Sequence, residues 1–291
     1  MTDILVISKK RTYFSTSEII KSLKKREVNA RYIKTENLRL CVEGDSVSLS
    51  YKRENLTNVG SIIPRIGRSL TNFGYSMIRH FEILGVPTTL SSFGLLHARN
   101  KFLALQSLVG SGIPFPESWL AGSKIEFGAI KEKMDFPIII KLLSGTQGVG
   151  VMRINNERDA IPIIDTMEEL KQLILIQEYL KNEGEDLRAF VVDGKVVAAM
   201  RRISPEYDWR ANIHAGGKGV AYQLTSEEEE MTVKAAEKLK LGVAGIDLLQ
   251  TPDGPRLIEA NVSPGFRGLL AATGINAADA IADYAIKLSK K

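Results

Sequence analysis

Residues 243–261 carry the most informative pattern in the chain, with two apolar runs around a turn in the sequence VAGIDLLQTPDGPRLIEAN. The central TPDGP segment is typical of a β-turn, and its flanks are typical of half-buried strands. Pairing Gln250 with Arg256 across this turn would place Asp247 opposite Glu259. The pattern therefore predicts a β-hairpin with two carboxylates facing each other.

One face of this hairpin is predicted to be polar. Because side chains alternate between faces along a strand, Asn261 joins Asp247 and Glu259, and Gly245 leaves the corner opposite Asn261 open. The other face takes the apolar side chains Ile246, Leu248, Ile258 and Ala260.

The facing carboxylates predict a bound cation, because like charges opposite each other destabilise a sheet unless a cation lies between them. Oxygen ligands of this kind suit Mg²⁺, which completes its shell with water and nucleotide phosphates. These residues therefore favour an ATP site. An acidic pair on a solvated face explains the hairpin equally well, so other parts of the chain must decide.

A predicted strand that ends in a lysine precedes a glycine-rich loop. Residues 137–141 read PIIIK, which is typical of a buried strand that ends in Lys141, and residues 144–150 follow with SGTQGVG. Backbone N–H groups of such a loop can approach phosphate oxygens, and the lysine adds charge. The loop is neither a Walker A motif nor a Gly-x-Gly-x-x-Gly fingerprint, and a plain hairpin turn is the alternative.

Two further segments carry paired charges. A predicted strand at 173–177 leads into Glu178 and Tyr179, and Asp186 and Arg188 then follow two residues apart, so they share a face. That pair suits ribose and phosphate contacts, with a surface ion pair as the alternative. Further on, Arg201-Arg202 precedes WRANIHAGG at 209–217, a cationic, glycine-rich segment typical of an active-site loop.

These motifs resemble the ATP-grasp superfamily in order and spacing, and within it the RimK-type α-L-glutamate ligases over nearly the whole chain. The resemblance is carried by Lys101, Lys141 with Gly145 to Gly150, Gln177-Glu178-Tyr179, Asp186-x-Arg188, Arg210-x-Asn212, and Asp247 with Glu259-x-Asn261. Residues 64–67 (PRIG), 145–150 (GTQGVG) and 261–265 (NVSPG) are also similar to that family's signatures.

The resemblance implies a fold and a reaction. The expected fold is α/β, an ATP-grasp fold in which an N-terminal α/β domain precedes two lobes that clamp ATP. In the expected reaction ATP phosphorylates a carboxylate, an amine attacks the acyl phosphate, and an amide forms with release of ADP and phosphate. Catalysis of this kind is mainly electrostatic, so no histidine or cysteine nucleophile is needed.

The resemblance also implies a role for each matched residue. Asp247, Glu259 and Asn261 would hold two Mg²⁺ ions, with Mn²⁺ as an alternative. The residues expected to bind ATP are Lys101, Lys141, Gly145, Gln147, Gly148, Glu178, Tyr179, Asp186, Arg210 and Asn212. The residues expected to face the transferred phosphoryl group are Arg210, Asn212, Arg188 and Arg201. Replacing Asp247 or Glu259 by Ala should abolish turnover and leave the fold intact.

Departures from the family pattern concern the substrate side. Asn100 precedes Lys101 where the family often has an aspartate, Ala215 follows His214 where a basic residue is common, and Phe266-Arg267 replaces a more usual apolar and acidic pair. Arg65 and Arg267 are the candidates for substrate contact. Arg267 fits a glutamate carboxylate and a plain surface position equally well.

Charge is concentrated at the start of the chain, where residues 1–96 contain 15 Lys and Arg against 8 Asp and Glu. Such a lobe can steer an acidic substrate, an RNA-rich particle or a polyglutamate tail toward a cleft. A solvated basic helix at 17–26 is the preferred source of most of this charge. Direct reading of nucleic acid is not expected.

Composition favours a cytoplasmic enzyme. Cys41 is the single cysteine, no apolar run is long enough to span a bilayer, and the N-terminal residues predict a first strand and no signal peptide. At 291 residues the chain should divide into several lobes, predicted at 1–96, 97–178 and 179–291. A homo-oligomer is expected.

The periodic patterns predict alternating strands and helices. Strands are expected near 4–7, 30–33, 61–64, 86–89, 117–121, 137–143, 150–154 and 173–178, before the antiparallel strands of the last lobe. Helices are expected at 17–27, 71–84, 95–111, 125–133, 157–170, 226–240 and 276–288.

Three functions are consistent with the sequence. The first is a ligase that adds L-glutamate to a ribosomal protein C-terminus, to itself as poly-α-glutamate, or to a glutamyl-tailed cofactor. The second is a ligase of lysine or arginine biosynthesis that uses an acidic carrier protein. The third is a non-catalytic module that binds a nucleotide or the ribosome.

Overall fold

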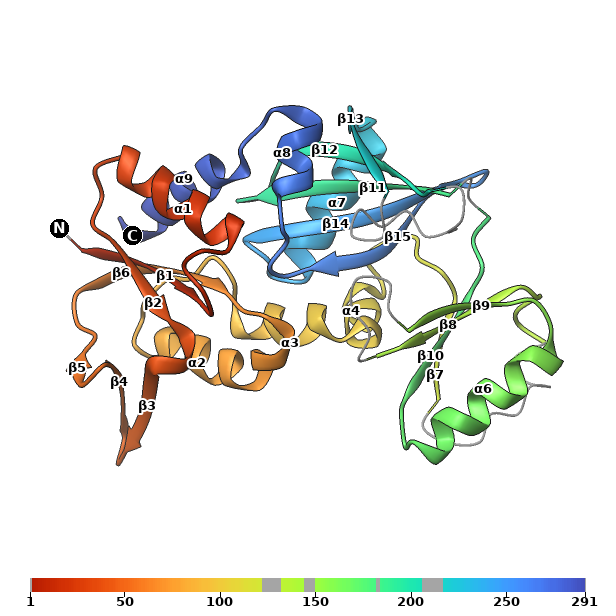
Figure 1. Cartoon of the computed structure of the whole chain (residues 1–291), viewed down its shortest axis with the longest axis horizontal. Coiled ribbons are helices and arrows are strands. Elements are labelled where there is room, and N and C mark those ends of the chain that lie inside the picture. The colour runs from red at the N-terminus through yellow and green to blue at the C-terminus, as the bar shows by residue number, and fades with distance from the viewer. Residues whose placement is uncertain (1, 122–131, 144–149, 182–183, 206–216, 291) are drawn as a thin grey trace.

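The computed structural model describes residues 2–121, 132–143, 150–181, 184–205 and 217–290 (Figure 1). Helices and strands occur throughout these residues, so the predicted α/β class is confirmed. No helix among the described residues is long and apolar enough to cross a membrane.

The N-terminal region comprises residues up to the end of α2. Its elements are β1 (Asp3–Ser8), α1 (Phe14–Lys25), β2 (Ala30–Lys34), η1 (Thr35–Asn37), β3 (Leu38–Glu43), β4 (Ser46–Tyr51), β5 (Glu54–Asn55), β6 (Val59–Arg65), η2 (Arg68–Leu70) and α2 (Thr71–Ile83). Strands β2, β1 and β6 form a parallel sheet in that order. Every residue of β1 is buried, because the sheet is covered on both faces.

Three elements here differ from the sequence-based expectation. Strands β3, β4 and β5 form a small antiparallel sheet that was not predicted. The expected strand at 86–89 is reduced to an isolated parallel bridge between Ile62 and Thr88. The expected helix at 95–111 is two helices, α3 (Ser92–Arg99) and α4 (Lys101–Leu108). They separate at Asn100, whose extended backbone starts α4 and whose side chain accepts hydrogen bonds from the next turn.

The central region forms an antiparallel sheet with its own core. Its elements are β7 (Ser118–Ala121), β8 (Ile138–Leu142), β9 (Val151–Ile154), α6 (Glu157–Glu169) and β10 (Ile174–Glu178), in the sheet order β7-β10-β8-β9. Ile164 of α6 packs with Ile140 and Ile176 in a cluster separate from the other two cores. Most of the helix predicted at 125–133 lies outside the described residues.

The C-terminal region is built on a five-stranded antiparallel sheet in the order β13-β12-β11-β14-β15. Its elements are β11 (Glu185–Val192), β12 (Lys195–Ile203), β13 (Lys218–Tyr222), α7 (Ser226–Lys238), β14 (Val243–Thr251), β15 (Gly254–Asn261), α8 (Arg267–Thr273) and α9 (Ala277–Ser289). One face packs Leu187 and Leu248 against α7, and the other packs Phe190 and Met200 against Phe266 beside α8.

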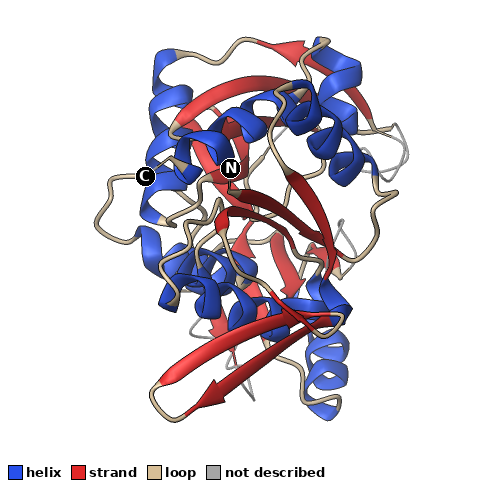
Figure 2. Ribbon diagram, turned by 90° about the vertical axis from the view of Figure 1, so that its left-hand side faces the viewer, coloured by secondary structure: helices blue, strands red, loops and turns tan. Residues whose placement is uncertain are grey.

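The last helix returns to the N-terminal region. Helix α9 packs on α1 and β6, and both termini lie on this side of the molecule (Figures 1 and 2). Arg26 of α1 donates to Asp283 at 2.6 Å and to Asp279 at 3.0 Å. Buried side chains of both regions share two hydrophobic clusters. The first and last regions therefore pack as one body, whereas the central region has a core of its own.

Candidate active site

Strands β14 and β15 form the predicted hairpin. Asp247 lies opposite Glu259, and Gly245 lies opposite Asn261. The pairing near the turn differs by one residue, since Gln250 pairs with Pro255 and not with Arg256. A bulge next to Asp247 restores the predicted pairing.

The bulge also changes which apolar residues are buried. Leu257 is 1% exposed and points into the core, whereas Ile258 is only half-buried. The prediction that Ile258 would share the core face with Ile246, Leu248 and Ala260 was therefore wrong. It was correct for the other three, which are all buried.

Asp247 is held by two arginines. Arg188, directly opposite on β11, donates through Nε to Oδ1 at 2.6 Å and through its terminal nitrogen to Oδ2 at 2.5 Å. Arg202 reaches the same Oδ2 at 3.1 Å. Burial alone would raise the pKa of Asp247, but the two guanidinium groups outweigh it and keep the pKa below its usual value.

Asp186 completes a network of alternating charges. Arg202 lies opposite Asp186 and donates to its two oxygens at 2.5 and 2.7 Å. Burial raises the pKa of Asp186 to about 6, with Arg202 acting in the opposite direction. The four groups, Asp186, Arg188, Arg202 and Asp247, thus form a buried network on one face of the sheet.

The structure brings Arg202 to this face and Arg201 to the other. Arg201 contacts Glu185 at 3.4 Å and stacks 4.9 Å from the centre of the Tyr222 ring. The sequence-based choice of Arg201 as a catalytic group is therefore not supported by its position. Arg202 was not among the predicted site residues. A regular β11–β12 hairpin would pair Asp186 with Arg201, and a one-residue bulge between Phe190 and Val191 pairs it with Arg202 instead.

Two lysines meet the hairpin at Glu259. Lys101, the first residue of α4, has its Nζ 3.3 Å from Oε1 of Glu259. Lys141 on β8 lies near both groups, and its burial lowers its pKa to about 8, with Glu259 raising it and Lys101 lowering it. Three parts of the chain thus converge on one carboxylate, and the family resemblance implied that these three residues share one site.

Three arginines lie next to the cluster of Glu259 and the two lysines. Arg65 at the end of β6 donates to the carbonyl oxygens of Ser263 and Pro264 at 3.3 and 2.7 Å. Arg99 donates to the carbonyl of Ile66 at 2.7 Å and lies near Glu259. Burial lowers the pKa of Arg65 and of Arg99 to about 10. Arg68 donates to the carbonyl of Leu143.

The remaining predicted residues lie apart from this cluster or outside the described residues. Arg267 is exposed, with its guanidinium 4.8 Å from the centre of the Phe14 ring. The Glu178 carboxylate accepts from the backbone of Glu117 at 3.1 Å, and Arg153 stacks on Tyr179. Gly145, Gln147, Gly148, Arg210 and Asn212 lie outside the described residues.

The hairpin residues fit a divalent cation. Among the described residues no cluster of three or more His, Cys, Asp and Glu side chains forms a metal site. Asp247, Glu259 and Asn261 offer two carboxylates and one amide oxygen, and the amide nitrogen of Asn261 lies 3.4 Å from the Gly245 carbonyl. The same nitrogen lies 3.5 Å from Oδ2 of Asp247, so the amide oxygen is the atom of Asn261 that could bind Mg²⁺.

Comparisons with known proteins identify the family. A RimK PreATP-grasp domain model matches residues 2–95, and a RimK-like ATP-grasp domain model matches residues 98–285. A probable alpha-L-glutamate ligase of Nitrosococcus oceani is 36% identical over 283 residues, which cover 97% of this chain and 94% of the relative. A probable alpha-L-glutamate ligase of Methanococcoides burtonii is 36% identical over 289 residues, which cover 99% of this chain and 96% of the relative.

Solved structures confirm the fold. The ATP-grasp ligase PsnB complexed with a minimal precursor superimposes with a TM-score of 0.78 at 18% identity, over 99% of both chains. D-alanine–D-alanine ligase from Bacillus anthracis complexed with ATP gives 0.72 at 18% identity, over 99% of this chain and 97% of that one. The resemblance found in the sequence motifs is confirmed, and the chain belongs to the RimK-like ATP-grasp family of ATP-dependent ligases.

Proposed function

We propose that the protein joins L-glutamate to an acceptor by an ATP-dependent carboxylate–amine ligation that proceeds through an acyl phosphate and releases ADP and phosphate. The observation that carries this proposal is the meeting of Lys101, Lys141 and Glu259 beside Asp247 and Asn261. Lysines supply charge for phosphates, and the oxygen ligands supply a site for Mg²⁺. The names of the most similar relatives point to glutamate as the amino acid.

The hairpin would hold the metal. Asp247, Glu259 and Asn261 are the proposed ligands for two Mg²⁺ ions, with Mn²⁺ as an alternative. Bound ions would neutralise charge on the phosphates, which is electrostatic stabilisation of the transferred group. Arg188 and Arg202 orient the Asp247 carboxylate and keep it ionised.

The lysines would bind the nucleotide. Lys141 remains protonated at neutral pH because its pKa is about 8, so it can contact a phosphate as a cation. Lys101 lies on the first turn of α4, next to Glu259, and is also proposed to contact a phosphate. The backbone after β10, at Glu178 and Tyr179, is the proposed contact of adenine.

Asp186 is proposed for a different role from the one its motif implied. Both of its carboxylate oxygens accept from Arg202, at 2.5 and 2.7 Å. Arg202 in turn reaches Oδ2 of Asp247 at 3.1 Å. We therefore assign Asp186 to the positioning of Arg202, and through it of Asp247.

The acceptor is proposed to be acidic or glutamyl-tailed. A ribosomal protein C-terminus, poly-α-glutamate and a glutamyl-tailed cofactor all fit the half-buried Arg65, which borders the segment after Asn261. An acidic carrier protein of lysine or arginine biosynthesis is the second candidate, and the basic N-terminal region favours it as well. A cytoplasmic location and a homo-oligomer remain predictions.

A panel of amino acids tests the proposal. Purified protein is incubated with ATP, Mg²⁺ and each amino acid in turn, ADP release is followed, and the products are identified by mass spectrometry. Glutamate-dependent ADP and glutamyl products are expected. ADP release that requires aminoadipate and a carrier protein would favour the second candidate. Nucleotide binding without turnover under all conditions would favour the non-catalytic module.

A further inference from the structure

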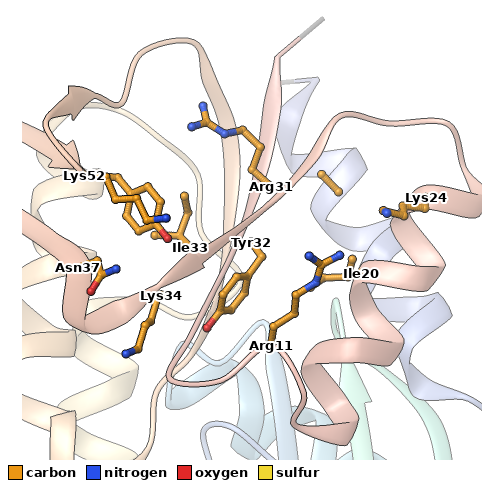
Figure 3. Close-up of a pocket in the computed structure, with 11 residues that line it drawn as sticks. Arg11, Ile20, Lys24, Arg31, Tyr32, Ile33, Lys34, Asn37 and Lys52 are labelled. Atoms are coloured by element: carbon orange, nitrogen blue, oxygen red, sulfur yellow. The ribbon is translucent and has the colours of Figure 1, made fainter.

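A basic groove lies on the N-terminal region, outside the site described above. It has a volume of about 650 Å³ and surrounds β2, the edge strand of the parallel sheet. Five of the residues that line it are cationic, namely Arg11, Lys24, Arg31, Lys34 and Lys52. Figure 3 shows these side chains distributed along both sides of the strand.

The positive charge of the groove is only partly balanced. Arg31 pairs with Asp3 at 2.9 Å, and Lys34 pairs with Glu36 at 2.9 Å. Among the described residues no carboxylate lies within ion-pair distance of Arg11, Lys24 or Lys52, and all three are exposed. The lining itself contains no acidic residue. Exposed, unbalanced cations around one groove favour an anionic ligand.

The shape of the groove favours an extended chain. Strand β2 is paired only with β1, so its outer edge offers backbone groups to a peptide in the manner of β-strand addition. Lining residues alternate along it, with Tyr32 and Lys34 on one face and Arg31 and Ile33 on the other. A peptide with acidic side chains would place carboxylates on both faces.

The groove is connected to the active site through the sheet. Lys34 pairs with Ser8, and Ser8 pairs with Arg65, so the three residues lie side by side at the carboxyl ends of their strands. Neighbouring strands are about 4.8 Å apart, which puts the backbones of Lys34 and Arg65 about 10 Å from each other. Arg65 in turn donates to Pro264, which lies three residues beyond Asn261. Ligands of parallel sheets bind at this edge.

We propose that the groove around β2 is a docking site for an acidic peptide chain, a run of glutamyl residues that belongs to the acceptor. Cations of the groove would hold the chain while its end passes Arg65 toward Glu259. The identity of the chain rests on the proposed function, whereas the binding of an acidic peptide does not. The site would let the protein keep one acceptor through successive additions.

Direct binding tests this inference without catalysis. A fluorescently labelled hexaglutamate peptide is titrated with the protein in the absence of ATP, and its anisotropy is followed. The test variant is Arg11→Gln/Lys24→Gln. The matched control is Lys234→Gln/Lys238→Gln on α7, which also removes two cations, one of them from the last turn of a helix as Lys24 is. Hexaglutamine serves as the uncharged peptide.

We expect the test variant to bind hexaglutamate roughly tenfold more weakly than the wild type, with a smaller dependence on salt. The control variant should bind as the wild type does, and hexaglutamine should not bind. Equal affinity of both variants for hexaglutamate would overturn the proposal. The cations would then be explained as charges that protect the edge of the sheet from pairing with another strand. Tighter binding of an oligouridylate would also overturn it, in favour of RNA.

The same proteins separate this inference from the proposed function. Glutamate-dependent ADP release with a short acceptor should be unchanged in the test variant, because neither residue contacts the hairpin or the lysines. If hexaglutamate binds the wild type selectively but no glutamate is ligated, the docking site stands and the proposed ligation fails. If glutamate is ligated but the two variants bind alike, only the docking site fails.

Discussion

Lys141 is the residue whose protonation should limit nucleotide binding. Burial lowers its pKa to about 8, so the ammonium is charged at neutral pH and loses its proton as the pH rises through that value. We expect kcat/KM for ATP to fall above this pH in the wild type. In Lys141→Arg the guanidinium stays protonated, so the fall should move to higher pH. Identical profiles in a steady-state assay would contradict the role of Lys141.

Asp247 and Glu259 should differ in their contribution to stability, although we expect the loss of either to abolish turnover. Asp247 is buried between Arg188 and Arg202, so Asp247→Ala leaves Arg188 without its carboxylate partner and Arg202 with Asp186 alone, and it should cost roughly 3–5 kcal/mol. Glu259 is 38% exposed, and Glu259→Ala should cost under about 1 kcal/mol. The structure thus changes the expectation that either substitution leaves the fold intact.

Urea unfolding of the two variants measures this difference. Equal stabilities would show that the buried network does not depend on the Asp247 carboxylate. Because the pKa of Asp247 is held below its usual value, its contribution to stability should be present at neutral pH and lost as the pH falls through that lowered pKa.

At the scale of elements, the break between α3 and α4 positions Lys101. The Asn100 side chain accepts from the backbone N–H groups of Phe102 and Leu103 at 3.0 and 3.2 Å. Asn100→Ala should cost about 1 kcal/mol and raise the KM for ATP, because Lys101 is the first residue of the helix that it caps.

Asn276→Ala is the matched control for this prediction. Asn276 caps α9 by accepting from the backbone of Ala278 at 3.1 Å, and its amide nitrogen also donates to Glu18 of α1 at 3.1 Å. It should lose a similar amount of stability with no change in the KM for ATP. A rise in KM in both variants would attribute the effect to general destabilisation and not to the position of Lys101.

The elements also show what the sequence could and could not predict. The hairpin at 243–261 was predicted because its turn signal and its alternation agree. The pattern does not reveal bulges, which explains the error at Ile258 and why the pairing of Asp186 with Arg202 could not be predicted. The sheet of β3, β4 and β5 was missed although Leu38, Leu40 and Val42 alternate before a Gly-Asp turn.

The sequence pattern could not predict tertiary contacts. That Asp186 and Asp247 share Arg202 follows from the pairing of three strands, which local periodicity does not specify. The family resemblance implied that Lys101, Lys141 and Glu259 share one site, and in the structure Lys101 contacts Glu259 with Lys141 near both.

At the scale of the whole molecule, the central region should unfold separately. Its core shares no cluster with the rest of the described residues, whereas the first and last regions share two. Calorimetry should therefore show two transitions. Arg26→Ala removes the contacts from α1 to Asp279 and Asp283, so it should lower only the transition of the body formed by the first and last regions. A single transition, or a shift in both, would contradict this division.

The proposed function requires that the hairpin and the lysines form the active site of a glutamate ligase. Its most direct test is glutamate-dependent ADP release, measured with ATP and Mg²⁺ in the wild type and in Glu259→Gln, with products identified by mass spectrometry. We expect ADP and glutamyl products in equal amounts from the wild type, and neither from a folded Glu259→Gln. Undiminished turnover in Glu259→Gln, or ADP release indifferent to glutamate, would contradict the account.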